Sequence, residues 1–157
     1  MSEPAPAPAI VKIPPPVWTF AMLLIAYGAQ RSFAWASIVY MRSPAAAIAL
    51  ALAGIALAVS AERNFAAAGT EIMPASPANK ALVTGGPFRF TRNPMYSGLL
   101  LASLGVALYF GTLPFFAVPA LLFLLVNFVF VPFEEAKMLR QFGDRYTEYC
   151  ARVRRWV

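Results

Sequence analysis

The sequence predicts an all-α integral membrane protein with four or five transmembrane helices, and its composition leads to this class. Of the 157 residues, 60% are hydrophobic or aromatic, against roughly 45–50% in an ordinary soluble domain. Only 13% are charged, about half of the usual share. A soluble domain of this size could not cover its surface with so few charges. We therefore expect the lipid bilayer to be the solvent for most of the chain.

The positions of the charges predict where the membrane spans lie. Three stretches carry no charge: 18 residues between Lys12 and Arg31, 19 between Arg42 and Glu62, and 41 from Asn93 to Phe133. About 20 helical residues cross a hydrocarbon core roughly 30 Å thick. The third stretch is long enough for two helices, and Gly-Thr-Leu-Pro at 111–114 predicts a tight turn between them. The expected spans are about 16–30, 44–62, 94–111 and 114–133, within one domain, 16–157.

The N-terminal region leaves alternatives open. Residues 1–15 are rich in proline and lack helical periodicity, which predicts a mobile arm. The segment 31–42 contains a second apolar stretch, which can be a loop, an interfacial helix or part of the first span. A secretory signal peptide cleaved after Ala34-Trp35-Ala36 is a competing interpretation. It is disfavoured because three prolines directly precede the apolar stretch and Lys12 is the only basic residue before it.

Lysine and arginine predict the orientation in the membrane. Eleven of them lie in the N-terminal arm, the 62–93 segment and the tail after residue 133, whereas only Arg31 and Arg42 lie in the first connection. By the positive-inside rule, both termini and the 62–93 segment face the cytoplasm, and the protein is in the inner (cytoplasmic) membrane. The net charge of +6 then suits anionic lipid head groups, so we expect no nucleic-acid partner.

Two residue counts exclude several kinds of site. The chain has no histidine, which excludes a histidine general base, a Ser-His-Asp triad and a histidine-ligated metal. Cys150 is the single cysteine, which excludes an intramolecular disulfide and a cysteine-rich metal site. We therefore expect no metal. Cys150 itself is interpreted as a small packed apolar residue, with palmitoylation as the alternative.

The first polar segment, 62–96, gathers functional residue types where the third span begins. Residues 84–87 (Thr-Gly-Gly-Pro) predict a tight turn whose glycines can adopt positive φ and expose backbone N–H groups. Asn93 suits the N-cap and Pro94 the first position of the next helix. Arg92, Asn93 and Tyr96 are thereby placed together at the membrane boundary. The alternative is that the arginines are only positive-inside anchors and the glycines only turn the chain.

The second polar segment starts with Glu134 and Glu135. Two carboxylates at a membrane boundary are costly unless they are paired or hydrated. Adjacent helical positions point about 100° apart, so we expect one to face a cavity and the other to pair with Lys137, Arg92 or solvent. The sequence does not decide which, and a solvated cap on a helix leaving the lipid is the alternative.

The tail predicts a short amphipathic helix. Gly143 is a helix stop and Asp144 an expected N-cap. Apolar and aromatic side chains then recur at three- and four-residue steps, at Tyr146, Tyr149, Cys150, Val153 and Trp156. Such a helix is expected to lie on the membrane or to fold over a cytoplasmic pocket.

The order of these motifs resembles a known family. The sequence reads Gly69-Thr70, then Leu82-Val83-x-x-Gly86-Pro87-Phe88-Arg89-Phe90-x-Arg92-Asn93-Pro94-x-Tyr96, an uncharged hairpin, and then Glu134-Glu135, Phe142-Gly143, Tyr146, Tyr149 and Arg152-Val153. Over residues 62–157 this closely resembles the integral-membrane isoprenylcysteine carboxyl methyltransferases and the related phospholipid N-methyltransferases. The first two spans match them only in being hydrophobic.

The resemblance implies a cofactor, a substrate class and a site. The cofactor is S-adenosylmethionine, bound in a cytoplasmic pocket built from the 62–96 segment and the C-terminal amphipathic segment. The substrate is lipid-like or prenylated, an isoprenylcysteine-like carboxylate or a phospholipid amine, and enters from the bilayer. The implied catalytic residues are Arg92, Asn93, Tyr96 and Glu135. The implied cofactor-binding residues are Leu82, Val83, Gly85, Gly86, Pro87, Arg92, Asn93, Pro94, Tyr96, Glu134 and Glu135.

One position departs from the family. The eukaryotic isoprenylcysteine enzymes have histidine where this chain has Asn93. Because an amide cannot accept a proton at neutral pH, only a hydrogen-bonding role remains for Asn93. The other residue types suit the cofactor, since a guanidinium can pair with its carboxylate, a glutamate with its ribose hydroxyls or ammonium, and aromatic faces with its sulfonium.

Two other functions fit parts of the sequence. Membrane sterol and steroid reductases, which use NADPH, resemble the C-terminal architecture, but they are generally longer and lack the adjacent glutamate pair. The third interpretation is a non-catalytic membrane protein that retains the fold. Retention of both halves of the expected pocket, on either side of the uncharged hairpin, argues against it.

Overall fold

A computed structural model describes residues 8–76 and 78–157. The described residues are helical and contain no strand, only an isolated bridge between Val39 and Thr112. The α-helices are α1 (Pro15–Ser32), α2 (Pro44–Ala67), α3 (Pro94–Phe110), α4 (Leu113–Leu125), α5 (Val131–Phe142) and α6 (Asp144–Arg152). Short 3-10 helices are η1 (Ala9–Lys12), η2 (Ala34–Ser37) and η3 (Gly86–Arg89), and η4 (Val126–Phe130) is a π-helical turn.

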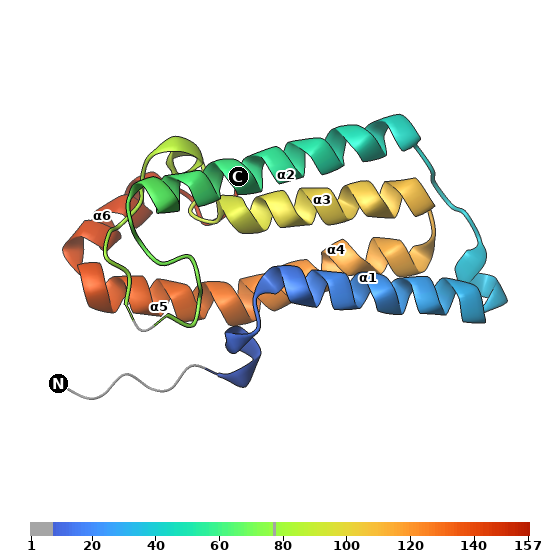
Figure 1. The fold of residues 1–157 in the computed structure, drawn as a ribbon, viewed down its shortest axis with the longest axis horizontal. Coiled ribbons are helices and arrows are strands. Elements are labelled where there is room, and N and C mark those ends of the chain that lie inside the picture. Colours follow the sequence, from blue (N-terminus) through green and yellow to red (C-terminus); the bar gives the residue numbers. More distant parts are fainter. Residues whose placement is uncertain (1–7, 77) are drawn as a thin grey trace.

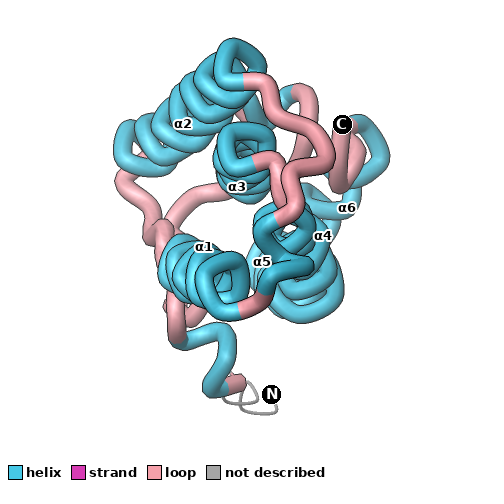
Figure 2. The backbone as a smooth tube through the Cα atoms, turned by 90° about the vertical axis from the view of Figure 1, so that its right-hand side faces the viewer, coloured by secondary structure: helices cyan, strands magenta, loops and turns pink. Residues whose placement is uncertain are grey.

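The long helices form an antiparallel bundle (Figures 1 and 2). Helices α4 and α5 are joined through η4 into one continuous helix, Leu113–Phe142. Helix α3 packs against α2 and α4, and α1 packs against α4. The C-terminal end of α2, the start of α3, helix α5 and helix α6 lie together at the left end of the bundle in Figure 1, together with the 68–93 connection. The polar segments of the sequence therefore meet at one end of the molecule.

The all-helical prediction is confirmed, and helices occupy all four predicted span positions. Among the described residues, Pro44–Ala67 and Leu113–Phe142 are long and apolar enough to cross a membrane, with mean hydropathies of 2.1 and 2.4. Pro94–Phe110 is apolar but shorter. Membrane crossing by four or five helices stays a prediction. Helix α2 continues to Ala67, beyond the expected end at Glu62, so charged residues lie on its last turns.

Close packing of α2 on α3 depends on glycine. A Cβ added at Gly98 would lie 2.5 Å from the backbone O of Gly54, and one added at Gly105 would lie 2.7 Å from the backbone O of Ala47. The two backbones are therefore in direct contact, as small residues allow between apolar helices. This contact fixes the C-terminal half of α2 over the start of α3, where the polar residues gather.

The structure of the connection between α1 and α2 bears on the alternatives left open for residues 31–42. Residues 33–43 hold only the short η2 followed by extended backbone, so they neither extend α1 nor add a fifth long helix. The backbone N–H groups of Tyr40 and Met41 donate to the carbonyl of Gly111, at 2.9 and 3.3 Å. Gly111 has φ 73°, which favours glycine and turns the chain between α3 and α4. The first connection and the hairpin turn are thus bonded at the end of the bundle opposite α6.

Both ends of the chain differ in detail from the sequence expectation. Of the expected mobile arm, residues 1–7 lie outside the described residues, whereas Val11 in η1 is fully buried. In the tail, Asp144 is the first residue of α6 and not its N-cap, because Gly143 occupies the cap with φ 51°. Val153 has extended backbone. The predicted helical face therefore ends at Cys150, and Val153 and Trp156 are not on it.

Candidate functional site

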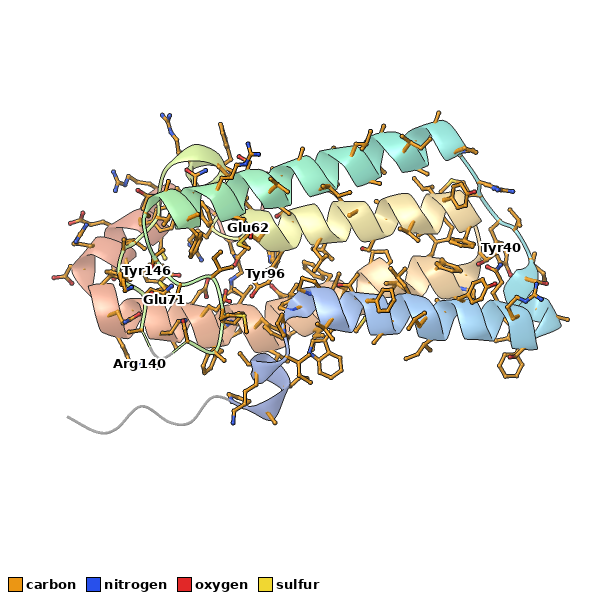
Figure 3. All side chains as sticks on the ribbon, viewed as in Figure 1. Tyr40, Glu62, Glu71, Tyr96, Arg140 and Tyr146 are labelled. Carbon is orange, nitrogen blue, oxygen red and sulfur yellow. The ribbon has the colours of Figure 1, made fainter. Side chains whose placement is uncertain are left out.

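A cavity of about 380 Å³ lies at the polar end of the bundle. Its walls come from the start of α1, the C-terminal half of α2, residues 71–74, 79 and 81–83, residues 88–99, the first half of α5, and α6. Figure 3 shows Glu62, Glu71, Tyr96 and Tyr146 at this end, with Tyr40 at the opposite end. The volume is in the range of about 300–1,000 Å³ that is typical of small-molecule sites.

Most of the predicted site residues line this cavity. They are Leu82, Val83, Arg92, Asn93, Pro94, Tyr96, Glu134 and Glu135. The predicted residues Gly85, Gly86 and Pro87 are not among its lining residues. Two segments about forty residues apart in sequence, 92–96 and 134–135, therefore share one hollow.

Arg92 joins three parts of the chain. Its Nη2 donates to Oε1 of Glu135 at 2.8 Å, and its Nη1 donates to the carbonyls of Val153 and Cys150 at 3.0 and 3.3 Å. Its side chain is 14% exposed. Burial is the largest single influence and alone would lower the pKa of Arg92, but the hydrogen bond with Glu135 and the charge interactions with Glu135 and neighbouring groups together outweigh it, so the pKa lies above its ordinary value. The guanidinium is therefore a fixed cation that holds α6 and α5 against the start of α3.

The two adjacent glutamates diverge as their helical spacing requires. Glu135 accepts from Arg92 and also from Arg155, whose Nε lies 3.1 Å from Oε1 and whose Nη2 bonds Oε2. Glu134 instead accepts from the hydroxyl of Tyr96 on α3 at 2.6 Å. Both line the cavity. The expected pairing of one glutamate with Arg92 is thus found at Glu135.

Asn93 occupies the N-cap of α3, although its side chain makes no capping bond. Its Nδ2 donates to the carbonyl of Arg155 at 3.0 Å, and its backbone N–H donates to Oγ1 of Thr91 at 3.2 Å. The Thr91 hydroxyl also donates to the carbonyl of Arg155, at 2.9 Å. The amide thus acts through hydrogen bonds, the role left open for it by its chemistry.

The predicted glycine turn serves packing against α2. Gly86 has φ 57°, and a Cβ there would lie 2.7 Å from the side-chain atoms of Asn64. Gly85 has φ −92° and precedes η3. Phe88, which follows in η3, is buried against Phe65, with ring centroids 5.2 Å apart. The turn therefore places η3 against α2. Leu82 and Val83 before the turn and Phe88 after it line the cavity.

Lys137 and Asn79 organise one wall of the cavity and were missed as site residues. Nζ of Lys137 donates to the carbonyl of Pro74 at 2.9 Å, and the side chain is buried. Nδ2 of Asn79 donates to the carbonyl of Glu71 at 2.8 Å. Lys137 follows Glu134 by three residues, so the two share a helix face. That spacing could have predicted that Lys137 lies in the same wall as Glu134. No sequence feature predicted the position of Asn79.

Helix α6 closes the cavity through two tyrosines. Tyr146 and Tyr149 are buried and line the cavity. The hydroxyl of Tyr149 donates to the carbonyl of Phe88 at 2.7 Å. Burial raises the pKa of Tyr149 to about 12 and raises the pKa of Tyr146 as well. Both phenols stay neutral at physiological pH. Helix α6 therefore contributes to the cavity wall, and its position relative to the membrane stays a prediction.

Two polar atoms on the cavity-lining residues have no hydrogen-bond partner within the described part of the chain. They are Nε of Arg92, a donor, and Oδ1 of Asn79, an acceptor, and both atoms are buried. Buried polar groups are normally satisfied, and leaving one unpaired costs free energy.

Comparison with known families identifies the class of protein. A model of the phospholipid methyltransferase family matches residues 43–145, well over half of the chain. The chain therefore belongs to the phospholipid methyltransferase family, a family of membrane methyltransferases, and the resemblance found in the sequence is confirmed. No curated protein and no solved structure matches the chain.

The matched region covers α2 to α5 and both the 92–96 and 134–135 segments. It ends at Arg145, the second residue of α6. The tail that bonds to Arg92, Asn93 and Glu135 lies beyond it. The family match therefore accounts for the two main walls of the cavity but not for its C-terminal part.

Proposed function

We propose that the protein transfers the methyl group of S-adenosylmethionine to a lipophilic acceptor embedded in the membrane, either an isoprenylcysteine-like carboxylate or a phospholipid amine. The observation that carries the proposal is the single cavity shared by residues 92–96 and 134–135. Membership of a methyltransferase family supports methyl transfer as the reaction class, and it disfavours the NADPH-dependent reductase.

The residues of the cavity fit the polar groups of this cofactor. Arg92 and Asn79 both line the cavity, where the guanidinium offers a cation for its carboxylate and the side-chain amide offers a hydrogen-bond partner for its ammonium or adenine amine. Glu134 and Glu62 line the same cavity and offer acceptors for ribose hydroxyls or the ammonium. The ring of Tyr96 lies on this wall as a face for the sulfonium.

The apolar part of the cavity supports an acceptor that arrives from the bilayer. Ile55, Ala58 and Val59 of α2, Leu99 of α3 and the prolines 14–16 that open α1 line this part. Helix α2 is long and apolar enough to span a membrane. A lipid tail can therefore remain among apolar side chains while its head group reaches the polar wall.

The residues act by binding, alignment and exclusion of water. When bound, the cofactor supplies an electrophilic methyl group, whose transfer is an in-line displacement that depends mainly on alignment of the reacting atoms. Glu135 accepts a hydrogen bond from Arg92, and the side-chain amide of Asn93 donates one to the carbonyl of Arg155. Tyr96 holds Glu134. We propose these four, Arg92, Asn93, Tyr96 and Glu135, as the residues on which activity depends most.

We place the cavity on the cytoplasmic side of the inner membrane, with both termini on that side. What supports this is the location of the basic residues. Eleven of the thirteen lysines and arginines are Lys12 and those of the 62–93 segment and of the chain after residue 133. The end of α2 and helices α5 and α6, which belong to the last two regions, lie at the cavity end of the bundle (Figure 1). The positive-inside rule assigns that end to the cytoplasm.

The experiment that tests the function is a labelling reaction. The detergent-purified protein is incubated with methyl-labelled S-adenosylmethionine and a total lipid extract, and the lipids are separated. We expect one lipid class to gain label, and Glu135→Gln to abolish the incorporation. A label released by mild base identifies a methyl ester, and a base-stable label identifies a methylated amine. Absence of label from every lipid, with folded protein, would contradict the proposal.

A further inference from the structure

The last residues of the chain are bonded to the candidate site at several points. The carbonyl of Arg154 accepts from the backbone N–H of Arg92 at 2.9 Å. The carbonyl of Arg155 accepts from Thr91 and Asn93, at 2.9 and 3.0 Å. From here on, the word tail means only residues Val153–Trp156, which follow α6. It lies beside the Arg-Asn-Pro segment and outside the part of the chain that the family model matches.

Arg155 donates two hydrogen bonds to the carboxylate of Glu135. Its Nε donates to Oε1 at 3.1 Å and its Nη2 to Oε2. Such a forked guanidinium–carboxylate pair fixes the plane of the carboxylate as well as its position. Arg92 reaches only Oε1. Without Arg155, Glu135 would keep one partner and could rotate, and Oε2 would lose its donor.

Trp156 anchors the tail to the long helix. Its Nε1 donates to Oδ1 of Asn127 at 2.9 Å, and its ring lies 5.3 Å from that of Phe123. Asn127 belongs to the π-helical turn η4. Such turns often occur at functional sites. The anchor therefore fixes the tail, and with it Arg155, relative to the helix that carries Glu134 and Glu135.

We propose that Arg155 is a positioning residue of the cofactor site. It holds the Glu135 carboxylate in one orientation, Glu135 holds Arg92, and Arg92 is thereby kept in its place in the cavity wall. The inference rests on the proposed function, because it takes this cavity to be the S-adenosylmethionine site. It assigns a binding role to the C-terminal tail, whose residues are not themselves among those that line the cavity.

The test compares two neighbouring arginines. Arg155→Ala removes the fork, whereas Arg154→Ala removes an exposed side chain and leaves its backbone carbonyl in place. Binding of S-adenosylhomocysteine is measured by titration calorimetry on detergent-purified protein. We expect Arg155→Ala to weaken binding by about tenfold or more, the effect of losing one charged hydrogen bond. Arg154→Ala should bind as the wild type does.

Two further measurements separate positioning from stability. Arg155→Lys retains the charge but cannot form the fork, so it should fold like the wild type and still bind more weakly, to an intermediate degree. The lipid that gains label in the reaction above is the acceptor. Its KM, measured at saturating S-adenosylmethionine, should stay unchanged in both Arg155 variants. Wild-type binding by folded Arg155→Ala and Arg155→Lys would overturn the inference alone. Failure of the wild type to bind S-adenosylhomocysteine would instead overturn the proposed function.

Discussion

Replacing Arg92 by alanine is the perturbation that probes most of the site at once. The guanidinium donates to Glu135 and to the carbonyls of Val153 and Cys150. Arg92→Ala removes all three bonds and leaves both carbonyls without this donor. Glu135 keeps its fork with Arg155, so the carboxylate is not left without a counter-charge.

These contacts set the size of the effect. A hydrogen bond that involves a charged group contributes about 1.5–3 kcal/mol. The 3.3 Å bond to Cys150 belongs at the low end, and the remaining partner of Glu135 keeps the loss below the roughly 3–5 kcal/mol of a fully orphaned buried charge. Counting only the two shorter bonds, at about 1.5 kcal/mol each, we expect the free energy of unfolding to fall by about 3 kcal/mol, which is a change of roughly a hundredfold in the folding equilibrium.

The assay is denaturant unfolding in detergent, with Arg89→Ala as the matched control. Arg89 is exposed. It is the last residue of η3 and precedes Arg92 by three residues. Its replacement should change the free energy of unfolding by less than about 0.5 kcal/mol. Arg92→Lys keeps a point charge but not the guanidinium, so its free energy of unfolding should lie between those of Arg92→Ala and Arg89→Ala. Equal stability of Arg92→Ala and Arg89→Ala would refute the assignment of Arg92 as the residue that joins α6 to the bundle.

Two further predictions concern the bundle and α6. Gly98→Ala forces α2 away from α3, because the new Cβ would lie 2.5 Å from the backbone O of Gly54. Thermal unfolding should show a loss of about 1–3 kcal/mol. In contrast, Gly28→Ala, which meets no atom within 4 Å, should be neutral or stabilising. The raised pKa of Tyr149, about 12 against an ordinary value of about 10, favours the neutral phenol in the folded state. Its stabilisation is complete below about pH 10 and lost as pH rises through the folded pKa, so alkaline unfolding curves of Tyr149→Phe should be flatter there.

Much of the fold could be predicted because the signals are local. Charge-free stretches gave the positions of the four long helices, and the Gly-Thr-Leu-Pro sequence at 111–114 gave the turn between two of them. The extension of α2 to Ala67 was not predicted. The expected end relied on charge, and Glu62 and Arg63 do not interrupt a helix once it has left the apolar region.

Residues that share the cavity were predicted where motif and spacing act together. Arg92, Tyr96 and the glutamate pair all line the cavity. The roles of the tail and of the loop at 71–79 could not be predicted, because they depend on which side chain meets which distant carbonyl. Lys137 bonding to Pro74 is one example, and Arg155 holding Glu135 is another. Gly86 differs from these residues, since the turn suggested a ligand contact, whereas Gly86 does not line the cavity and packs against the side chain of Asn64.

The most direct test of the account is cofactor binding by the purified protein. Thermal unfolding is measured in detergent with S-adenosylhomocysteine and, separately, with NADPH. A ligand that binds only the folded state raises the midpoint with concentration. We predict a rise with S-adenosylhomocysteine that Glu135→Gln abolishes, and no rise with NADPH. Stabilisation by NADPH, or by neither ligand, would contradict the assignment of this cavity to S-adenosylmethionine.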